Sequence, residues 1–322
     1  MSNCFNSNHQ KVRTGKIGIS PITNKNVGYI ILNGASNPSI LRRIWCKAKN
    51  IISIARNRKP TPLPPNLYFD PDIDFAFFYP RPSLAFIQKY YGGKDKSEVT
   101  LEDRATTYSP SLSDAGNEIL DWIESHFSDL RNKDKICGEL GVGLGWLANA
   151  AIKRGYSWTG IDANVQITNY LKSELKINTI NAMVQDLDCE FDLLTSVDTA
   201  EHFLNPLEDF RKIYTNIRPG GYFFVSVPNF NSVTARTNLD LHRYFAYPAH
   251  LNYFTEKSIR FTLESAKFVD VKVETRTFAW EIPYILEPYI KNNIFNWINS
   301  TFVDEMTKSG QGERLFALGR KR

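Results

Sequence analysis

Short apolar runs alternate with amphipathic stretches through residues 131–322 of the chain. Runs of roughly four to eight apolar residues predict buried strands, and apolar positions that recur every three or four residues predict helices. We expect strands that begin at 136 and 191 and cover 157–161, 180–184, 222–227, 269–278 and 314–319, and helices over 114–130, 146–154, 164–176, 206–216 and 256–267. This alternation predicts an α/β fold, a doubly wound sheet with helices on both faces. Such sheets bind ligands at the carboxyl ends of their strands.

A glycine-rich turn follows the first predicted strand. Its pattern is Glu139-x-Gly141-x-Gly143-x-Gly145, and such a turn brings bare backbone and helix N–H groups close to a ligand. A dinucleotide-binding turn, G-x-G-x-x-G, needs its third glycine for close packing of helix on strand. Counted from Gly141, that position holds the bulky Trp146. The turn therefore does not fit a dinucleotide.

Acidic residues end the following strands. Asp162 lies 17 residues after Gly145, where a carboxylate can accept two hydrogen bonds from a ribose diol, each worth about 1.5–3 kcal/mol. The predicted strand 180–184 runs into Gln185-Asp186-Leu187. Farther along stand Asp198-Thr-Ala-Glu-His-Phe-Leu-Asn-Pro206 and then Arg218-Pro-Gly-Gly, a strand and Pro228-Asn229.

These five segments, in this order over about 90 residues, resemble class I S-adenosylmethionine-dependent methyltransferases. Within that class they are similar to the ubiquinone-pathway O-methyltransferases and the sugar methyltransferases. The resemblance implies a seven-stranded Rossmann-like sheet, S-adenosylmethionine as cofactor, and a small-molecule acceptor that carries a sugar, nucleotide-sugar or quinone-like phenol hydroxyl. The residues that it assigns to the cofactor are Glu139, Gly141, Gly143, Leu144, Gly145, Asp162, Ala163, Asp186, Leu187, Ser196, Asp198 and His202.

Three residues are candidates for catalysis. Positioning of nucleophile and methyl group can supply roughly 7–11 kcal/mol, and a general base adds about 10²–10⁴-fold. His202 is the leading candidate, with Glu201 placed to orient it; the alternative is that His202 caps the next helix or lines the cofactor pocket. His250 and Tyr253 lie in a segment that resembles a family His-x-x-Tyr-Phe-Thr/Ser motif, in which the histidine is either a base or a structural latch.

The segment Phe75–Ser83 resembles the stretch that follows a zinc ribbon in many sugar-type relatives. A C-x-x-C pair of that ribbon would fall on Asp70 and Ile73. Structural zinc needs four nitrogen or sulfur ligands, which this segment does not supply. We therefore expect that the ribbon is lost or replaced and that the chain holds no metal.

Charge is distributed unevenly along the chain. Residues 1–69 contain eleven Lys and Arg residues and no Asp or Glu, whereas the rest of the chain has a net charge of −6. The proline-rich stretch 60–65 predicts a domain boundary. Before it, 40–59 has the pattern of a basic amphipathic helix, which docks on the acidic domain, contacts an anionic membrane, or has a nucleic-acid or targeting role.

These patterns predict three regions: a basic extension and linker over 1–66, a connecting segment and cofactor-covering helix over 67–130, and the methyltransferase domain over 131–322. Within the last, 229–253 is expected to form a lid over the substrate. The aromatic insertion 279–303 is expected to pack internally, to form a homodimer contact, or to hold an apolar substrate.

Several classes of protein are disfavoured. The chain has no run long and apolar enough for a membrane span and no secretory signal pattern, and its four cysteines form no C-x-x-C pair. A reducing, cytoplasmic location is expected, with membrane association through 40–59 as the variant. The residues after the fourth strand match neither adenine-N6 nor cytosine-C5 methyltransferases, so DNA is not the expected acceptor. The alternative function is an RNA-directed or non-catalytic protein that binds through its basic N-terminus.

Overall fold

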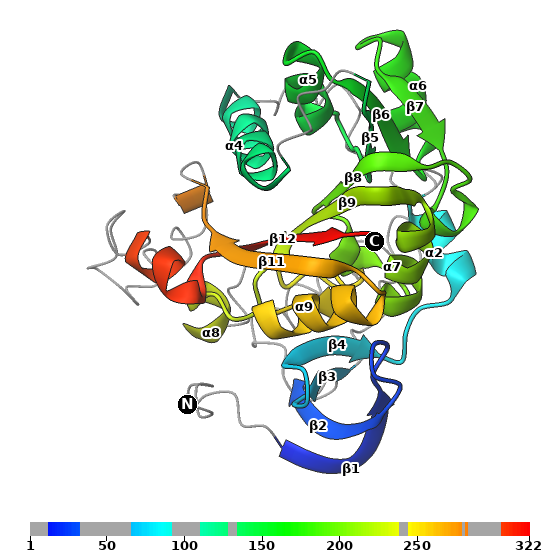
Figure 1. Ribbon diagram of the computed structural model, residues 1–322. Coiled ribbons are helices and arrows are strands. Elements are labelled where there is room, and N and C mark those ends of the chain that lie inside the picture. Colours follow the sequence, from blue (N-terminus) through cyan, green and yellow to red (C-terminus); the bar gives the residue numbers. More distant parts are fainter. Residues whose placement is uncertain are drawn as a thin grey trace, which may run out of the picture.

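Two β-sheets organise the protein in the computed structural model (Figure 1). The structure describes residues 12–32, 66–91, 110–127, 134–237, 244–278, 281–282 and 304–322. The larger sheet has seven strands in the order β11-β12-β9-β8-β5-β6-β7. In chain order these strands are β5 Ile136–Leu140, β6 Ser157–Asp162, β7 Asn178–Asn181, β8 Phe191–Val197, β9 Ile217–Pro228, β11 Val269–Arg276 and β12 Arg314–Arg320.

Strands β5 to β9 of this sheet run parallel, and β12 runs antiparallel to both β9 and β11. This is the doubly wound α/β arrangement that the sequence pattern predicts. The expected strand 180–184 is shifted: β7 ends at Asn181, and residues Val184–Asp186 form a 3₁₀ turn, η2. The reason is the register, because Asn181 pairs with Asp162, the last residue of β6, and the ladder has no partner beyond it.

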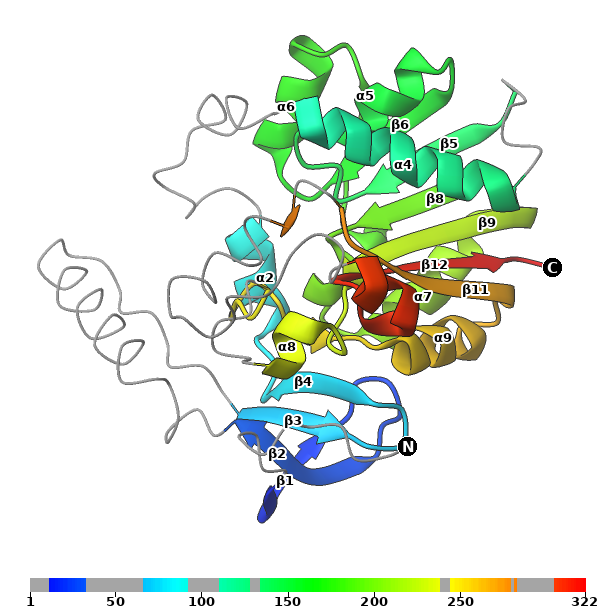
Figure 2. The same ribbon diagram turned by 90° about the vertical axis from the view of Figure 1, so that its left-hand side faces the viewer.

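Helices cover both faces of the large sheet (Figure 2). They are α4 Pro110–His126, α5 Trp146–Lys153, α6 Val165–Ser173, α7 Pro206–Thr215 and α9 Glu256–Ser265. Apolar side chains of α4, α5 and α6 pack in one core with Phe224 and Phe316, and those of α7 and α9 pack in another with Phe223 and Leu315. Neighbouring residues of β9 and of β12 thus point into opposite cores, as expected for a sheet buried on both faces.

Shorter elements connect these layers. They are α2 Leu84–Tyr91, the 3₁₀ turn η3 Ala200–His202, α8 Val233–Thr237 and the irregular helical turn η4 Thr307–Gln311. No helix within the described residues is long and apolar enough to cross a membrane. The basic stretch 40–59, most of the insertion 279–303 and the middle of the expected lid 229–253 lie outside the described residues.

The second sheet is antiparallel, with the order β1-β2-β3-β4-β10. Its strands are β1 Val12–Ile19, β2 Asn26–Leu32, β3 Asn66–Asp70, β4 Phe75–Tyr79 and β10 Asn252–Tyr253. It lies beside α8 and α9 in both views (Figures 1 and 2). The proline-rich stretch expected to be a domain boundary comes between β2 and β3 in the sequence, and these two strands pair in one sheet.

Two turns of the second sheet are joined by side chains. The hydroxyl of Thr23, in the β1–β2 turn, donates to Oδ2 of Asp70 at 2.7 Å. Asp70 Oδ1 accepts from the backbone N–H of Asp72 at 3.1 Å, and Ile73 is buried in the core that also contains Phe75. The two positions at which a C-x-x-C pair was considered thus hold a hydrogen-bonded carboxylate and a core residue.

Arg81 connects the second sheet to the large one. Its guanidinium donates to the carbonyl oxygen of Phe203 at 2.9 Å, of Leu204 at 2.7 and 3.0 Å, and of Leu251 at 3.0 Å. A further bond runs to Oδ1 of Asn252 at 2.8 Å. A planar guanidinium can reach several fixed acceptors at once, which a lysine ammonium cannot do in the same geometry. Arg81 therefore fixes the loop after β8 and the start of β10 relative to β4.

We predict that Arg81→Met lowers the free energy of unfolding by about 3 kcal/mol or more, because it removes five hydrogen bonds from a charged donor, including both bonds to the carbonyl oxygen of Leu204. Urea unfolding followed by circular dichroism measures the change. Arg211→Met is the matched control: Arg211 is 50% exposed and pairs only with exposed Glu208, so its loss should matter by less than about 1 kcal/mol. Equal unfolding curves for the two variants would show that Arg81 does not hold the sheets together.

Candidate functional site

The glycine turn after β5 has the backbone that its sequence requires. Gly141, Gly143 and Gly145 have φ angles of 69°, 53° and 75°, a region that L side chains rarely adopt. A Cβ on Gly141 would meet Oγ1 of Thr199 at 2.0 Å, whereas a Cβ on Gly143 would come no closer than 3.8 Å to another atom. Gly141 thus packs the turn against the segment after β8, and Gly143 leaves the backbone open to approach. Leu144, the remaining residue of the turn, is half-buried.

Asp162 at the end of β6 is fixed by backbone donors. Its Oδ2 accepts from the N–H of Gly143 at 3.2 Å, and its Oδ1 accepts from the N–H of Asn164 at 2.8 Å. Asn164 in turn caps α6 through its side-chain oxygen. The carboxylate therefore stands between the glycine turn and the first turn of α6, with half-buried Ala163 beside it. Each of its oxygens has further acceptor capacity for a diol.

Glu139 and Ser196 are buried polar residues within the large sheet, on β5 and β8. Glu139 Oε2 and Ser196 Oγ have no hydrogen-bond partner, although buried polar groups are nearly always paired. Burial raises the pKa of Glu139 to about 8. Unpaired polar atoms beside an open glycine turn fit a ligand with donors of its own, such as the amino and ribose groups of S-adenosylmethionine. The residues present thus fit the cofactor that the sequence implies.

The two residues expected beside the adenine occupy different surroundings. Asp186 ends η2 on the surface, whereas Leu187 is 1% exposed and packs in the core with Ala200. Contact of Leu187 with an adenine ring stays a prediction.

Asp198 is engaged by an arginine that the sequence analysis did not single out. Its φ angle of 50° turns the chain at the end of β8, and its Oδ1 accepts from Arg314 Nη1 at 2.5 Å. Arg314 is 3% exposed and also donates to Glu281 at 2.8 Å and to the hydroxyl of Tyr244 at 3.0 Å. The half-exposed carboxylate of Asp198 is therefore paired with a buried arginine, and its role in cofactor binding stays a prediction. An arginine inside the apolar run 314–319 was the available signal.

His202 lies in η3 with both ring nitrogens near carbonyl oxygens. Nδ1 is 2.7 Å from the oxygen of Ala249, and Nε2 is 3.0 Å from that of Asp198. A carbonyl oxygen only accepts, so both bonds form only when the ring carries both of its protons. Which of the two bonds forms depends on which nitrogen of the ring carries a proton, and the role of His202 as a general base stays a prediction.

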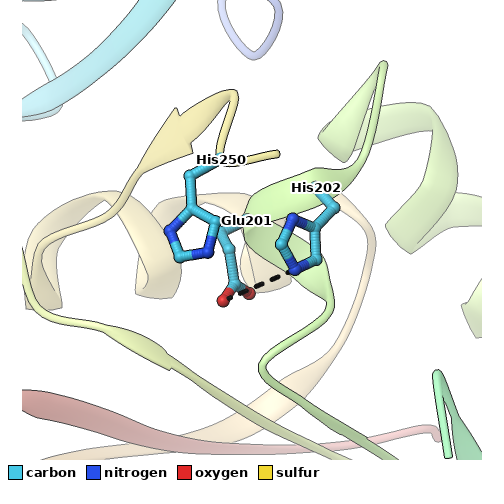
Figure 3. Close-up of side chains that lie close together, drawn as sticks. All are labelled: Glu201, His202 and His250. Atoms are coloured by element: carbon cyan, nitrogen blue, oxygen red, sulfur yellow. Dashed lines mark ion pairs between the residues drawn. The ribbon is translucent and has the colours of Figure 1, made fainter. Parts of the chain in front are cut away.

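Glu201 is the partner of the two histidines. It is 1% exposed, and neither of its carboxylate oxygens has a hydrogen-bond partner. Oε1 lies 4.0 Å from Nε2 of His202, and burial raises the pKa of Glu201 well above its usual range. Figure 3 shows that the imidazoles of His202 and His250 both face this carboxylate. The rings of the two histidines lie edge to face, with centroids 4.8 Å apart.

His250 is positioned by its own backbone and by its neighbours. Its N–H donates to the carbonyl oxygen of Ala246 at 2.8 Å, and its ring stacks with Tyr244 at 6.3 Å between centroids. Tyr253 was expected to be catalytic, but its ring packs among aromatic core residues and its hydroxyl donates to the backbone oxygen of His250 at 3.4 Å. The hydroxyl of Tyr253 thus contacts the backbone that carries His250, and a catalytic role of Tyr253 stays a prediction.

Asn252 holds the segment that carries Glu201 and His202. Its side-chain amide donates to the carbonyl oxygens of Glu201 at 3.1 Å and of Phe203 at 2.7 Å. The N–H of Leu251 adds a bond to the oxygen of Glu201 at 2.9 Å. The sequence analysis passed over Asn252, although a polar residue between Leu251 and Tyr253 in an apolar run was a usable signal.

Known proteins similar to this chain include ubiquinone biosynthesis O-methyltransferases. That of Stutzerimonas stutzeri is 33% identical over 138 residues, and that of Pseudomonas putida is 29% identical over the same length. Each alignment covers 40% of this chain and 58% of the relative, so this chain matches little more than half of their length.

Two solved structures are also similar. A S-adenosylmethionine-dependent methyltransferase from Archaeoglobus fulgidus aligns with 63% of this chain and 94% of its own, at 16% identity and a TM-score of 0.43. One from Mesorhizobium loti aligns with 58% and 91%, at 16% identity and a TM-score of 0.42.

Residues 112–273, about half of the chain, match the type-23 methyltransferase domain family. That range begins in α4 and ends in β11. It includes the glycine turn, Asp162 and the three neighbouring residues Glu201, His202 and His250, which we call the Glu201 cluster. The chain therefore belongs to this family and is a class I S-adenosylmethionine-dependent methyltransferase.

Proposed function

We propose that the protein transfers a methyl group from S-adenosylmethionine to a hydroxyl oxygen of a small molecule. The acceptor class is a sugar, a nucleotide sugar or a quinone-like phenol. The similarity to ubiquinone biosynthesis O-methyltransferases supports an oxygen acceptor. The observation that carries the proposal is the convergence of Glu201, His202 and His250 beside the cofactor turn.

The cluster lies next to the place at which a methyl group would be presented. Thr199 contacts Gly141 of the glycine turn, and Glu201 follows two residues later. An acceptor hydroxyl bound at this cluster would meet the carboxyl group of Glu201 and two imidazoles. Such groups orient a hydroxyl and take up or stabilise its proton, whereas an amine acceptor must only lose a proton after transfer.

Most of the catalytic advantage is expected from positioning. When bound, S-adenosylmethionine supplies a methyl group activated by its positively charged sulfur. The acceptor oxygen bonds to the methyl carbon while the carbon–sulfur bond breaks, its electron pair stays on the sulfur, and the hydroxyl proton leaves. Asp162 would hold the ribose diol, and Glu139 would accept from the cofactor's donors. Holding the two reacting atoms in line contributes up to roughly 7–11 kcal/mol.

The RNA-directed or non-catalytic alternative depends on the basic N-terminal region. Of that region the structure describes 12–32, which form β1, β2 and their turn in the second sheet. Contact of 40–59 with an anionic membrane and homodimer formation stay predictions.

The proposal is tested by incubating the protein with S-adenosylmethionine and, separately, a catechol, a nucleotide sugar and a primary amine. Mass spectrometry of the products should show one added methyl group on a hydroxyl acceptor. Glu201→Gln should reduce its formation, since the cluster would lose its charge. Methylation of the amine alone would contradict an oxygen acceptor.

We predict that Asp162→Ala weakens binding of S-adenosylmethionine by about 100-fold or more, because two charge-assisted hydrogen bonds of about 1.5–3 kcal/mol each are lost. Isothermal titration calorimetry measures the affinity. Asp270→Ala is the matched control, since Asp270 pairs with Arg320 on an exposed edge strand. Asp162→Asn keeps the shape of the side chain but removes its charge. A loss of affinity in this variant is therefore due to ligand binding and not to a change in the shape of the turn. Wild-type affinity in both Asp162 variants would place the cofactor elsewhere.

A second prediction concerns pH. Because burial raises the pKa of Glu139 from 4.5 to about 8, the folded protein holds this proton more tightly than the unfolded chain does. The resulting stability is present below about pH 4.5 and is lost as the pH rises through 8.

Relative to Glu139→Gln, the wild type should therefore lose up to about 5 kcal/mol of unfolding free energy between pH 5 and 9. Urea unfolding at both pH values, without cofactor, measures the difference. Glu208→Gln, at an exposed position, controls for the loss of a carboxylate. A difference between wild type and Glu139→Gln that does not change with pH would contradict this account.

A further inference from the structure

We infer that Glu201, His202 and His250 form a binding site for a divalent transition-metal cation. We further infer that the cation selects acceptors with two adjacent oxygen atoms, such as a catechol or a vicinal sugar diol. The second statement rests on the proposed function, whereas the first does not. This differs from the expectation drawn from sequence that the chain holds no metal, which considered only the cysteine positions of a zinc ribbon.

The three side chains have the right atoms close together. One ligand atom of each, two imidazole nitrogens and one carboxylate oxygen, lies within 4.8 Å of the other two. Bonds of about 2.1 Å to one cation place three ligand atoms roughly 3.4 Å apart in tetrahedral geometry. A small rotation of the side chains therefore closes the site. Figure 3 shows the carboxylate of Glu201 close to both rings.

The buried carboxyl group of Glu201 is a second, independent observation that favours a bound cation. Its side chain is 2% exposed, and both of its oxygens lack a hydrogen-bond partner. The nearby guanidinium of Arg314 is bound to Asp198 and Glu281 instead. A buried carboxylate without donors is strongly disfavoured unless it is paired or coordinates a metal. A cation between Glu201 and the histidines supplies that partner.

The surroundings of His202 suit a metal ligand. Its Nδ1 donates to the carbonyl oxygen of Ala249 at 2.7 Å, and a metal-binding histidine commonly donates its second N–H to a backbone carbonyl in this way. This bond fixes the ring so that Nε2 faces Glu201. A cation at the site replaces the Nε2 proton that otherwise reaches the carbonyl oxygen of Asp198.

The ligand set determines the class of ion. Two imidazoles and one carboxylate suit zinc, iron(II), cobalt(II) or manganese(II), whereas magnesium and calcium prefer oxygen ligands alone. Three protein ligands leave coordination positions open. Two adjacent oxygen atoms of one acceptor can fill such positions together, which a lone hydroxyl cannot do.

The position relative to the glycine turn explains why such a cation would help transfer. Thr199 touches Gly141, and Glu201 is two residues farther along the same segment. A cation lowers the pKa of a bound hydroxyl, so the proton passes to water and no histidine needs to accept it. The oxygen then bonds to the methyl carbon as the carbon–sulfur bond breaks, with the electron pair left on sulfur. His250 is in that case a ligand rather than a base.

The test uses the full chain, stripped with chelator and titrated with Mn²⁺ while electron paramagnetic resonance reports the free ion. We expect one Mn²⁺ per chain, displaced by Zn²⁺ but not by an equal concentration of Mg²⁺. Glu201→Gln and His250→Phe should each weaken Mn²⁺ binding at least tenfold. His126→Ala, which changes a histidine on α4, is the matched control and should bind as the wild type does.

Two further measurements keep the result decisive. Thermal unfolding without metal shows whether the variants fold, and Glu201→Gln should unfold no earlier than the wild type because it removes a buried charge. Calorimetry with S-adenosylmethionine should give wild-type affinity in both cluster variants, so a failed metal site is distinguishable from a failed cofactor site. Equal Mn²⁺ binding by wild type and folded Glu201→Gln, or none by the wild type, would overturn the cation site.

With Mn²⁺ bound, adding catechol should change the resonance of the bound ion, and adding phenol should not. Equal effects of the two would overturn the selection of adjacent oxygens while leaving the cation site intact. Loss of all methyl transfer with retained Mn²⁺ binding would instead count against the proposed function.

Discussion

The guanidinium of Arg81 is buried between two sheets, and its donors end on backbone carbonyls of the two segments that form the candidate site. One segment carries Glu201 and His202, and the other carries His250. Neither segment is long enough in regular structure to fix itself: η3 has three residues and β10 has two. The cluster depends on Arg81, with Asn252 as the second anchor, for the distance between its members.

Polar groups that would destabilise a sheet without a ligand gather near the carboxyl ends of β5 and β8 in the large sheet. Glu139, Ser196 and Glu201 are buried with unpaired oxygens, and Asp198 is held at a positive φ. Strained or unsatisfied groups lower stability and persist where the surrounding structure compensates or a ligand completes them. Here the two aromatic and aliphatic cores on the faces of the sheet provide that compensation.

Much of the large sheet could be predicted from sequence because its signals are local. The glycine turn, the acid at 162 and the helix periods each depend on a few neighbouring residues. Contacts between distant residues were not predictable in this way: Arg314 lies 116 positions from Asp198, and Arg81 lies 170 from Leu251. The basic segment before residue 66 was interpreted from its charge. Its strands β1 and β2 form because β1 pairs with β2 and β2 with β3, and such pairing cannot be seen in a single sequence. The contact between His202 and the carbonyl oxygen of Ala249, 47 positions away, is another that neighbouring residues in the sequence do not reveal.

The second sheet draws its last strand, β10, from the methyltransferase half of the chain. The two edge strands of this sheet therefore come from distant parts of the chain, β1 from the N-terminal part and β10 from the methyltransferase domain. Removing β1 and β2 would uncover the backbone donors and acceptors of β3, whose side chains Leu67 and Phe69 are fully buried. Exposed apolar edge strands pair readily with other chains. Shortening this protein to begin at β3 would thus expose an apolar strand that can pair with another chain, and the pairing of β2 with β3 prevents such self-association.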